Sequence, residues 1–339
     1  MPRLVFFGTP TYSLIVLNRL YEAGFSILAV VTKPAQPVGR KQKLTESPVA
    51  EWAQAHSIRV FRPEVASGKS WQFADAAKLT QDIVNLKPDL LVVADYAQKI
   101  PAQLIAKIPA GGLNVHPSLL PAYRGPAPVP WVIINGETET GVSVVTLADE
   151  FDQGIVVAQE KEEIQPTDTT HSLLTRLFAK GTQLLVQVLP EYVKQPQMQW
   201  QQFNNETIQP SPSYTPRLTR DYGFIPWELI QAAMRGESFS SLIMKQWNNV
   251  TIVKTSIESK RNELSKTPVA ILLDRAFRAF HPWPGIWSKI TINGEEKRLK
   301  LLRVHLNQPA ILSLDEIQLE GKQPIRGRDV VNFLKQLTL

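Results

Sequence analysis

Two polar residues stand at the end of an apolar run in the first half of the chain. Asn114 and His116 are two positions apart, so in a strand their side chains point to the same face. An asparagine amide donates hydrogen bonds, and histidine exchanges a proton near neutral pH. Together they could stabilise the negative charge that develops on a carbonyl oxygen during nucleophilic attack. A polar strand end that feeds a turn is the simpler interpretation of an isolated Asn-x-His pair.

An acidic segment follows further along the chain. Asp152 opens an Asp-Gln-Gly sequence, and Asp149 and Glu150 stand just before it. A carboxylate from this segment could orient the imidazole of His116 and favour its charged form, as orienting acids do for other catalytic histidines. Taken alone, an Asp-x-Gly sequence is an ordinary turn.

A third group of residues is cationic. Lys33, Arg40, Lys41 and Lys43 lie in a segment that also holds two prolines and a glycine, a composition that argues against a helix. A solvated basic loop is one interpretation. The segment follows the second predicted strand, and open parallel sheets bind their ligands at the carboxyl ends of strands. This position favours contact with phosphates.

The elements that must position these residues alternate between apolar runs and helical patterns. Short runs that are almost continuously apolar indicate strands of a parallel sheet covered on both faces. The predicted strands are 4–8, 26–32, 58–61, 90–95, 113–116 and 141–147. The predicted helices are 12–23, 47–56, 101–108 and 169–194, with Ser47 and Pro48 as an N-cap and first-turn pair. This order predicts an α/β fold with a doubly wound, mainly parallel sheet.

The rest of the chain has a different pattern. Residues 195–213 contain six Gln and three Pro, which is typical of an extended linker. Beyond them, runs at 251–255, 289–292, 299–304 and 317–319 alternate, and Asn293-Gly294 is a strong hairpin signal. We therefore expect a catalytic domain over 1–194, a linker over 195–213 and a smaller domain over 214–339. That second domain is predicted to be an antiparallel β-barrel of the OB-like type with a helical tail over 328–337.

Composition excludes several classes of function. The 339 residues contain no cysteine, so thiol catalysis, disulfides and cysteine-ligated metals are excluded. The five histidines are scattered, which gives no support for a metal site. No run is apolar enough to span a membrane, and we expect a cytoplasmic protein.

Residues 1–200 are electrically balanced, whereas 201–339 carry 19 basic and 13 acidic residues. A basic second domain suggests a polyanionic partner, although a solvated basic surface explains the charge equally well.

Taken together, these segments resemble the folate-dependent formyltransferases. The resemblance rests on Asn-Val-His over 114–116, Ser-Leu-Leu-Pro-Ala-Tyr-Arg-Gly over 118–125 and the Asp-x-Gly sequence at 152–154. It covers the whole α/β domain. The Gly-Thr-Pro turn at 8–10, the basic segment and the Arg-Ala-Phe-His-Pro-Trp-Pro block over 278–284 are similar to family members that formylate methionyl-tRNA.

The resemblance implies a formyltransferase-like variant of the Rossmann fold and a specific reaction. The formyl group of 10-formyltetrahydrofolate would pass to the free α-amine of initiator methionyl-tRNA, with no metal ion, and we expect a monomer. Asn114 and His116 would stabilise the oxyanion, with Asp152 supporting His116. The folate would contact a loop, and the tRNA would contact the basic segment and the second domain. The implied folate-binding residues are Ser118, Leu119, Leu120 and Pro121; the tRNA-binding residues are Arg40, Lys41 and Lys43.

Other reactions fit parts of the same pattern. A formyltransferase acting on an amino-sugar nucleotide shares the catalytic set but should lack the basic segment. A glycinamide-ribonucleotide enzyme needs no second domain, and a hydrolase would replace the amine by water. An RNA-binding protein that has lost catalysis would not need Asn114, His116 and Asp152. Two features differ from the family's pattern. The residues 231–273 separate the region around Trp227 from the block over 278–284, which the family brings close together, and the residues 11–13 differ from those that the family has after the Gly-Thr-Pro turn.

Overall fold

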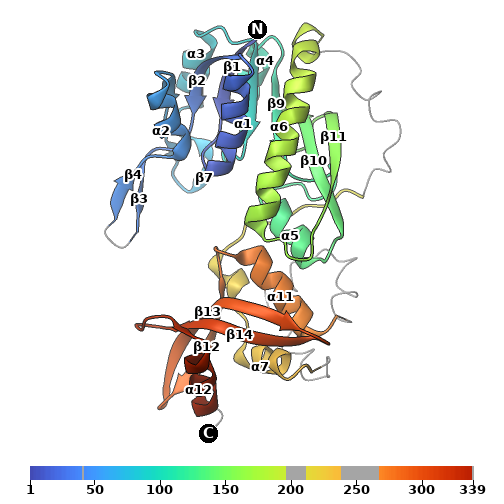
Figure 1. The fold of residues 1–339 in the computed structure, drawn as a ribbon. Helices are drawn as coiled ribbons and strands as arrows, with labels where there is room; N and C mark the ends of the chain where they lie inside the picture. Colours follow the sequence, from blue (N-terminus) through green and yellow to red (C-terminus); the bar gives the residue numbers. More distant parts are fainter. Residues whose placement is uncertain (40–41, 196–210, 238–266, 338–339) are drawn as a thin grey trace. The chain divides into compact units, whose positions relative to one another are not determined.

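The computed structural model describes residues 1–39, 42–195, 211–237 and 267–337 (Figure 1). The chain divides into two compact units. Unit 1 comprises residues 1–126, 139–163 and 174–214, and unit 2 comprises 127–138, 164–173 and 215–339. Unit 1 thus continues past residue 194, the predicted end of the catalytic domain, and most of the predicted linker lies outside the described residues.

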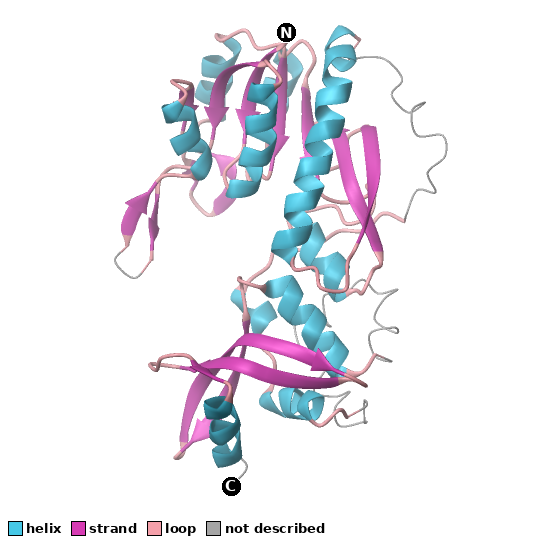
Figure 2. Ribbon diagram, in the orientation of Figure 1, coloured by secondary structure: helices cyan, strands magenta, loops and turns pink. Residues whose placement is uncertain are grey.

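Unit 1 is built on a seven-stranded sheet in the order β11-β10-β9-β8-β1-β2-β5 (Figure 2). The five strands from β9 to β5 are parallel, whereas β10 runs antiparallel to both β9 and β11. The strands are β1 (Arg3–Phe7), β2 (Ser26–Val31), β5 (Arg59–Phe61), β8 (Leu90–Ala94), β9 (Gly112–His116), β10 (Glu139–Thr146) and β11 (Val156–Glu163). This confirms the mainly parallel sheet and each of its six predicted strands.

Helices cover both faces of this sheet. In Figure 1, α1 and α6 lie over one face and α3 and α4 over the other. The second face carries a core in which residues of α3 and α4 pack against Val5, Leu91 and Val93. The helices are α1 (Thr11–Glu22), α2 (Pro48–Ala55), α3 (Ala76–Val84), α4 (Ala102–Lys107) and α6 (Thr170–Lys194, in unit 1 from Leu174 on). As predicted, the Ser47 hydroxyl caps α2, accepting a hydrogen bond of 3.0 Å from the Ala50 amide.

Helix α3 and two small hairpins have no counterpart in the prediction. The hairpins pair β3 (Gln36–Val38) with β4 (Lys43–Thr45), and β6 (Val65–Ala66) with β7 (Lys69–Phe73). Strands of two to five residues are too short for an alternation of apolar and polar residues to stand out. The basic segment is therefore not a simple loop: it carries the β3–β4 hairpin, which projects from the rest of unit 1 (Figure 1).

Unit 2 contains a four-stranded antiparallel sheet in the order β12-β13-β14-β15. Its strands are β12 (Ile286–Ile292), β13 (Glu295–Asn307), β14 (Ile311–Leu319) and β15 (Ile325–Arg326). Its helices are α5 (Pro128–Ile134), a short 3-10 helix (Arg220–Gly223), α7 (Trp227–Met234), α11 (Val269–Phe280) and α12 (Arg328–Leu337). Asn293 and Gly294 form the predicted hairpin turn, with φ of 51° and 79°, and the helical tail is present.

The predicted OB-like barrel needs correction. Among the described residues the four strands form an open sheet, because no pairing joins β12 to β15. Helices α7, α11 and α12 pack against β13 and β14, so helices cover the apolar side chains that a closed barrel would enclose. The predicted strand at 251–255 and most of the segment 231–273 lie outside the described residues. Within the described chain, no helix is both long and apolar enough to cross a membrane.

Candidate active site

Strand β9 places Asn114 and His116 on the same face of the sheet. Its register pairs Asn114 with Val93 of β8 and with Val145 of β10, so the strand is held on both sides. Val115 points to the opposite face, where α6 approaches closely: a Cβ added at Gly181 would lie 2.6 Å from the Val115 side chain. The asparagine is half-buried and the histidine is buried. The two predicted residues are therefore side by side in a rigid part of unit 1.

Asp152 reaches the same place from the loop between β10 and β11. Gly154 lets this loop lie against the end of β10, because a Cβ there would stand only 1.8 Å from the carbonyl oxygen of Thr146. The Thr146 hydroxyl accepts a hydrogen bond of 2.8 Å from the Ile155 amide. Asp152 itself has a left-handed backbone, with φ of 56°. The Asp-x-Gly sequence is thus a turn whose geometry also delivers a carboxylate.

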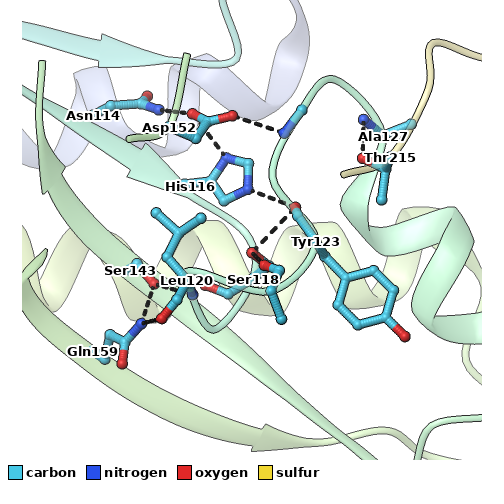
Figure 3. A network of polar contacts seen from close by, with 12 residues as sticks. Asn114, His116, Ser118, Leu120, Tyr123, Ala127, Ser143, Asp152, Gln159 and Thr215 are labelled. Carbon is cyan, nitrogen blue, oxygen red and sulfur yellow. Dashed lines mark hydrogen bonds and ion pairs between the residues drawn. The ribbon is translucent and has the colours of Figure 1, made fainter. Parts of the chain in front are cut away.

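The three predicted catalytic side chains form one polar network (Figure 3). The Asn114 amide donates to Asp152 Oδ1 at 3.3 Å, and His116 Nδ1 lies 3.4 Å from the same oxygen. Asp152 Oδ2 accepts a hydrogen bond of 2.9 Å from the Gly125 amide. His116 Nε2 lies 3.0 Å from the carbonyl oxygen of Tyr123.

This arrangement has one chemical consequence. Both ring nitrogens of His116 face oxygen atoms: Nε2 faces the Tyr123 carbonyl at 3.0 Å and Nδ1 faces the Asp152 carboxylate at 3.4 Å. The Nδ1 contact of 3.4 Å to Asp152 exceeds the usual 2.7–3.2 Å of an N–H···O bond. The N–H at Nδ1 and the second hydrogen of the Asn114 amide are therefore able to donate to a substrate oxygen.

The four residues predicted to bind folate lie in the loop after β9. Ser118 and Leu120 are buried, at 0% and 3% exposure, whereas Leu119 and Pro121 are half-buried. The Ser118 hydroxyl donates to the carbonyl oxygen of Ala122 at 2.7 Å. A ligand beside this loop would therefore meet backbone atoms and the half-buried side chains, with the Ser118 hydroxyl already engaged.

Strands β10 and β11 hold this loop through two polar side chains that the sequence analysis missed. The Ser143 hydroxyl accepts from the Leu120 amide at 3.1 Å and donates to the Ser118 carbonyl at 2.6 Å. Gln159 donates to the Leu120 carbonyl at 2.7 Å and to the Ser143 hydroxyl at 2.8 Å. Neither residue type marks a site by itself, so no sequence signal could have identified them.

The segment after β8 connects to the acidic loop. Lys99 forms ion pairs with Asp149 at 3.3 Å and with Glu150 at 3.8 Å. In the same segment the Tyr96 ring lies edge-on to Phe7, with centroids 5.5 Å apart. Burial raises the pKa of the Tyr96 hydroxyl, which therefore stays neutral at physiological pH. The Lys99 ion pairs therefore join the segment after β8 to the loop that carries Asp152.

The structure places only part of the predicted tRNA-binding set. Lys43 is exposed on β4 of the β3–β4 hairpin. Arg40 and Lys41 lie outside the described residues. Within the described residues, no group of three or more His, Asp or Glu side chains could hold a metal ion.

Comparison with known proteins places this chain in a family. The family model described as formyl transferase matches residues 2–189. A methionyl-tRNA formyltransferase of Enterococcus faecalis is 36% identical over 99% of this chain and 97% of its own length. One from Ligilactobacillus salivarius is 39% identical, but that match covers 57% of this chain and only 58% of the relative. The solved glycinamide ribonucleotide transformylase 1 of Symbiobacterium toebii is 17% identical and covers 57% of this chain and 88% of that one, with a TM-score of 0.48. Because the family model covers more than half of the chain and the first relative matches almost all of it, the chain belongs to the formyl transferase family.

Proposed function

We propose that this protein transfers the formyl group of 10-formyltetrahydrofolate to the α-amine of initiator methionyl-tRNA. The observation that carries the proposal is the shared network of Asn114, His116 and Asp152, which offers two donors beside one carboxylate. The choice of substrate is supported by the full-length similarity to a methionyl-tRNA formyltransferase. No observation favours an amino-sugar nucleotide as the acceptor.

The chemistry follows from these donors. The amine nitrogen attacks the formyl carbon and forms the new N–C bond, while the carbonyl electrons move to the formyl oxygen. An N–H at Nδ1 of His116 and the Asn114 amide hydrogen-bond to that oxygen, and each such donor typically contributes about 10²–10³ in rate. When the carbonyl re-forms, the bond to N10 of the folate breaks. N10 takes up a proton and the amine loses one, with Asp152 assisting through water.

The remaining assignments belong to the same proposal. The loop residues Ser118, Leu119, Leu120 and Pro121 would line the folate site, mainly through backbone atoms and shape. Arg40, Lys41 and Lys43 would contact the phosphates of the tRNA acceptor end, and the domain predicted over 214–339 would bind the rest of the tRNA. The protein would act as a monomer in the cytoplasm, where translation begins.

A transfer assay with a donor labelled in the formyl carbon tests the proposal. The acceptors are initiator methionyl-tRNA, elongator methionyl-tRNA and an amino-sugar nucleotide, and a reaction without acceptor measures free formate. We expect label on initiator methionyl-tRNA, and its loss in His116→Ala. Label on the sugar nucleotide alone, or only free formate, would refute the assigned reaction. Near-normal turnover in His116→Ala would refute the mechanism.

A further inference from the structure

Beyond the three predicted catalytic residues, one serine far along the sequence contacts the loop that holds His116. Ser213 directly precedes the end of unit 1 at Tyr214 and binds the loop through three hydrogen bonds. Its hydroxyl accepts from the Tyr123 amide at 2.8 Å, and its carbonyl accepts from the Arg124 amide at 2.9 Å. Its own amide donates to the Pro121 carbonyl at 3.3 Å.

The loop needs this support because Tyr123 has an unfavourable backbone. Its φ of 55° lies in the left-handed region, which a bulky residue adopts only when its surroundings hold it there. Ser213 supplies the partner of the Tyr123 amide. The Ser213 hydroxyl therefore holds the peptide group between Ala122 and Tyr123. The bond from the Arg124 amide to the Ser213 carbonyl holds the peptide group between Tyr123 and Arg124.

The peptide group between Tyr123 and Arg124 carries the carbonyl oxygen that orients His116. This carbonyl oxygen lies 3.0 Å from His116 Nε2 and 3.4 Å from the Ser118 hydroxyl (Figure 3). With Nε2 engaged there, the imidazole presents Nδ1 to Asn114 and Asp152. If the Tyr123 carbonyl turned away, the ring would lose the contact that decides which nitrogen faces the substrate.

We propose that Ser213 is a positioning residue for His116: its hydroxyl binds the Tyr123 amide and so holds the backbone of the residue whose carbonyl oxygen contacts His116 Nε2. This inference rests on the proposed function, because its effect is read in formyl transfer. Among these contacts the Ser213 side chain makes only the bond to the Tyr123 amide, because the bonds to Pro121 and Arg124 come from its backbone. Removal of the hydroxyl should therefore affect the chemical step and leave the binding of both substrates nearly unchanged.

The test compares three variants of the full chain in the transfer assay. Ser213→Ala removes the hydroxyl that accepts the hydrogen bond from the Tyr123 amide. We expect kcat to fall about tenfold, which corresponds to ~1.4 kcal/mol, the typical range for one hydrogen bond, with each KM within about twofold of the parent value. Ser213→Thr keeps the hydroxyl and should restore kcat. Ser211→Ala, at an exposed serine two positions earlier, is the matched control and should have no effect.

The outcomes separate this inference from the proposed function. An active parent protein whose kcat is unchanged in Ser213→Ala would overturn the inference only. A rise in either KM with unchanged kcat would also overturn it, because it would indicate a substrate contact. If the parent protein itself transfers no formyl group, the proposed function fails. Should Ser213→Ala be unfolded at the assay temperature, Ser213→Cys provides the same comparison, since a thiol is a weak acceptor of similar size.

Discussion

The substitution Gly154→Ala should displace Asp152 and also lower the stability of the fold. A Cβ at Gly154 would lie 1.8 Å from the Thr146 carbonyl oxygen and 2.7 Å from its carbonyl carbon. Both are backbone atoms of a sheet strand and cannot move aside as a flexible side chain would. Since real Cβ contacts essentially never fall under 3.0 Å, the loop must retreat by at least 1.2 Å.

Such a displacement is larger than the amount by which the hydrogen bonds of Asp152 can lengthen before they break. Its carboxylate lies 2.9 Å from the Gly125 amide, 3.3 Å from the Asn114 amide and 3.4 Å from His116 Nδ1. Lengthening each contact by about 1 Å would break all three, because hydrogen bonds are lost beyond ~3.5 Å. A misplacement of this size can cost about 100-fold in rate. Overpacking should also lower the free energy of unfolding by about 1–3 kcal/mol.

Steady-state formyl transfer and thermal unfolding measure these two effects separately. Gly68→Ala is the matched control: its φ of 74° also disfavours alanine, but no atom lies within 4 Å of the added Cβ. That variant should lose about 1–2 kcal/mol of stability and keep its kcat, whereas Gly154→Ala should lose both. A Gly154→Ala protein with a kcat within about threefold of the parent value would refute the claim that this glycine positions the carboxylate.

Three further predictions concern the catalytic network, the basic segment and a peripheral ion pair. The double variant His116→Ala/Asp152→Ala should be hardly slower in formyl transfer than the more damaged single variant, because residues that act as a unit are not additive; fully additive losses in kcat would show that they act independently. Arg40→Ala should raise the KM for methionyl-tRNA and leave that for the folate donor unchanged, whereas a solvated loop predicts no change in either at about 0.15 M salt. Hydrogen bonds from Arg3 lower the pKa of Asp89, so its contribution to stability is present at neutral pH and is lost as the pH falls through that folded-state pKa. Asp89→Asn should therefore lower the melting temperature slightly at pH 7 and flatten its decline as the pH falls below the ordinary carboxyl pKa of 3.8; a decline identical to the parent's would contradict this.

The elements that the sequence predicted well are those whose signal is local. Continuous apolar runs such as Leu90–Ala94 identify strands buried on both faces. Ser47 before Pro48 identifies a helix start, and Asn293-Gly294 identifies a hairpin. Each of these signals depends on neighbouring residues alone.

The second domain shows where such signals fail. Alternation along β13 and β14 indicates antiparallel strands, but closure into a barrel depends on what pairs with the two edges. The helices α7 and α11 pack against these strands instead. Whether strands or helices cover an apolar sheet face is decided by long-range packing, which a run of alternating residues does not encode.

The candidate site also contains some groups that the sequence identifies and others that it does not. Asn114, His116 and Asp152 could be proposed from the sequence because amide, imidazole and carboxylate side chains are able to donate, accept and exchange protons. The groups that hold them are mostly backbone atoms: the Tyr123 carbonyl at His116 and the Gly125 amide at Asp152. A peptide group can be supplied by any residue type, so its role leaves no trace in composition or spacing. The candidate side chains can therefore be identified in the sequence, whereas the atoms that fix their orientation are identified only in the folded chain.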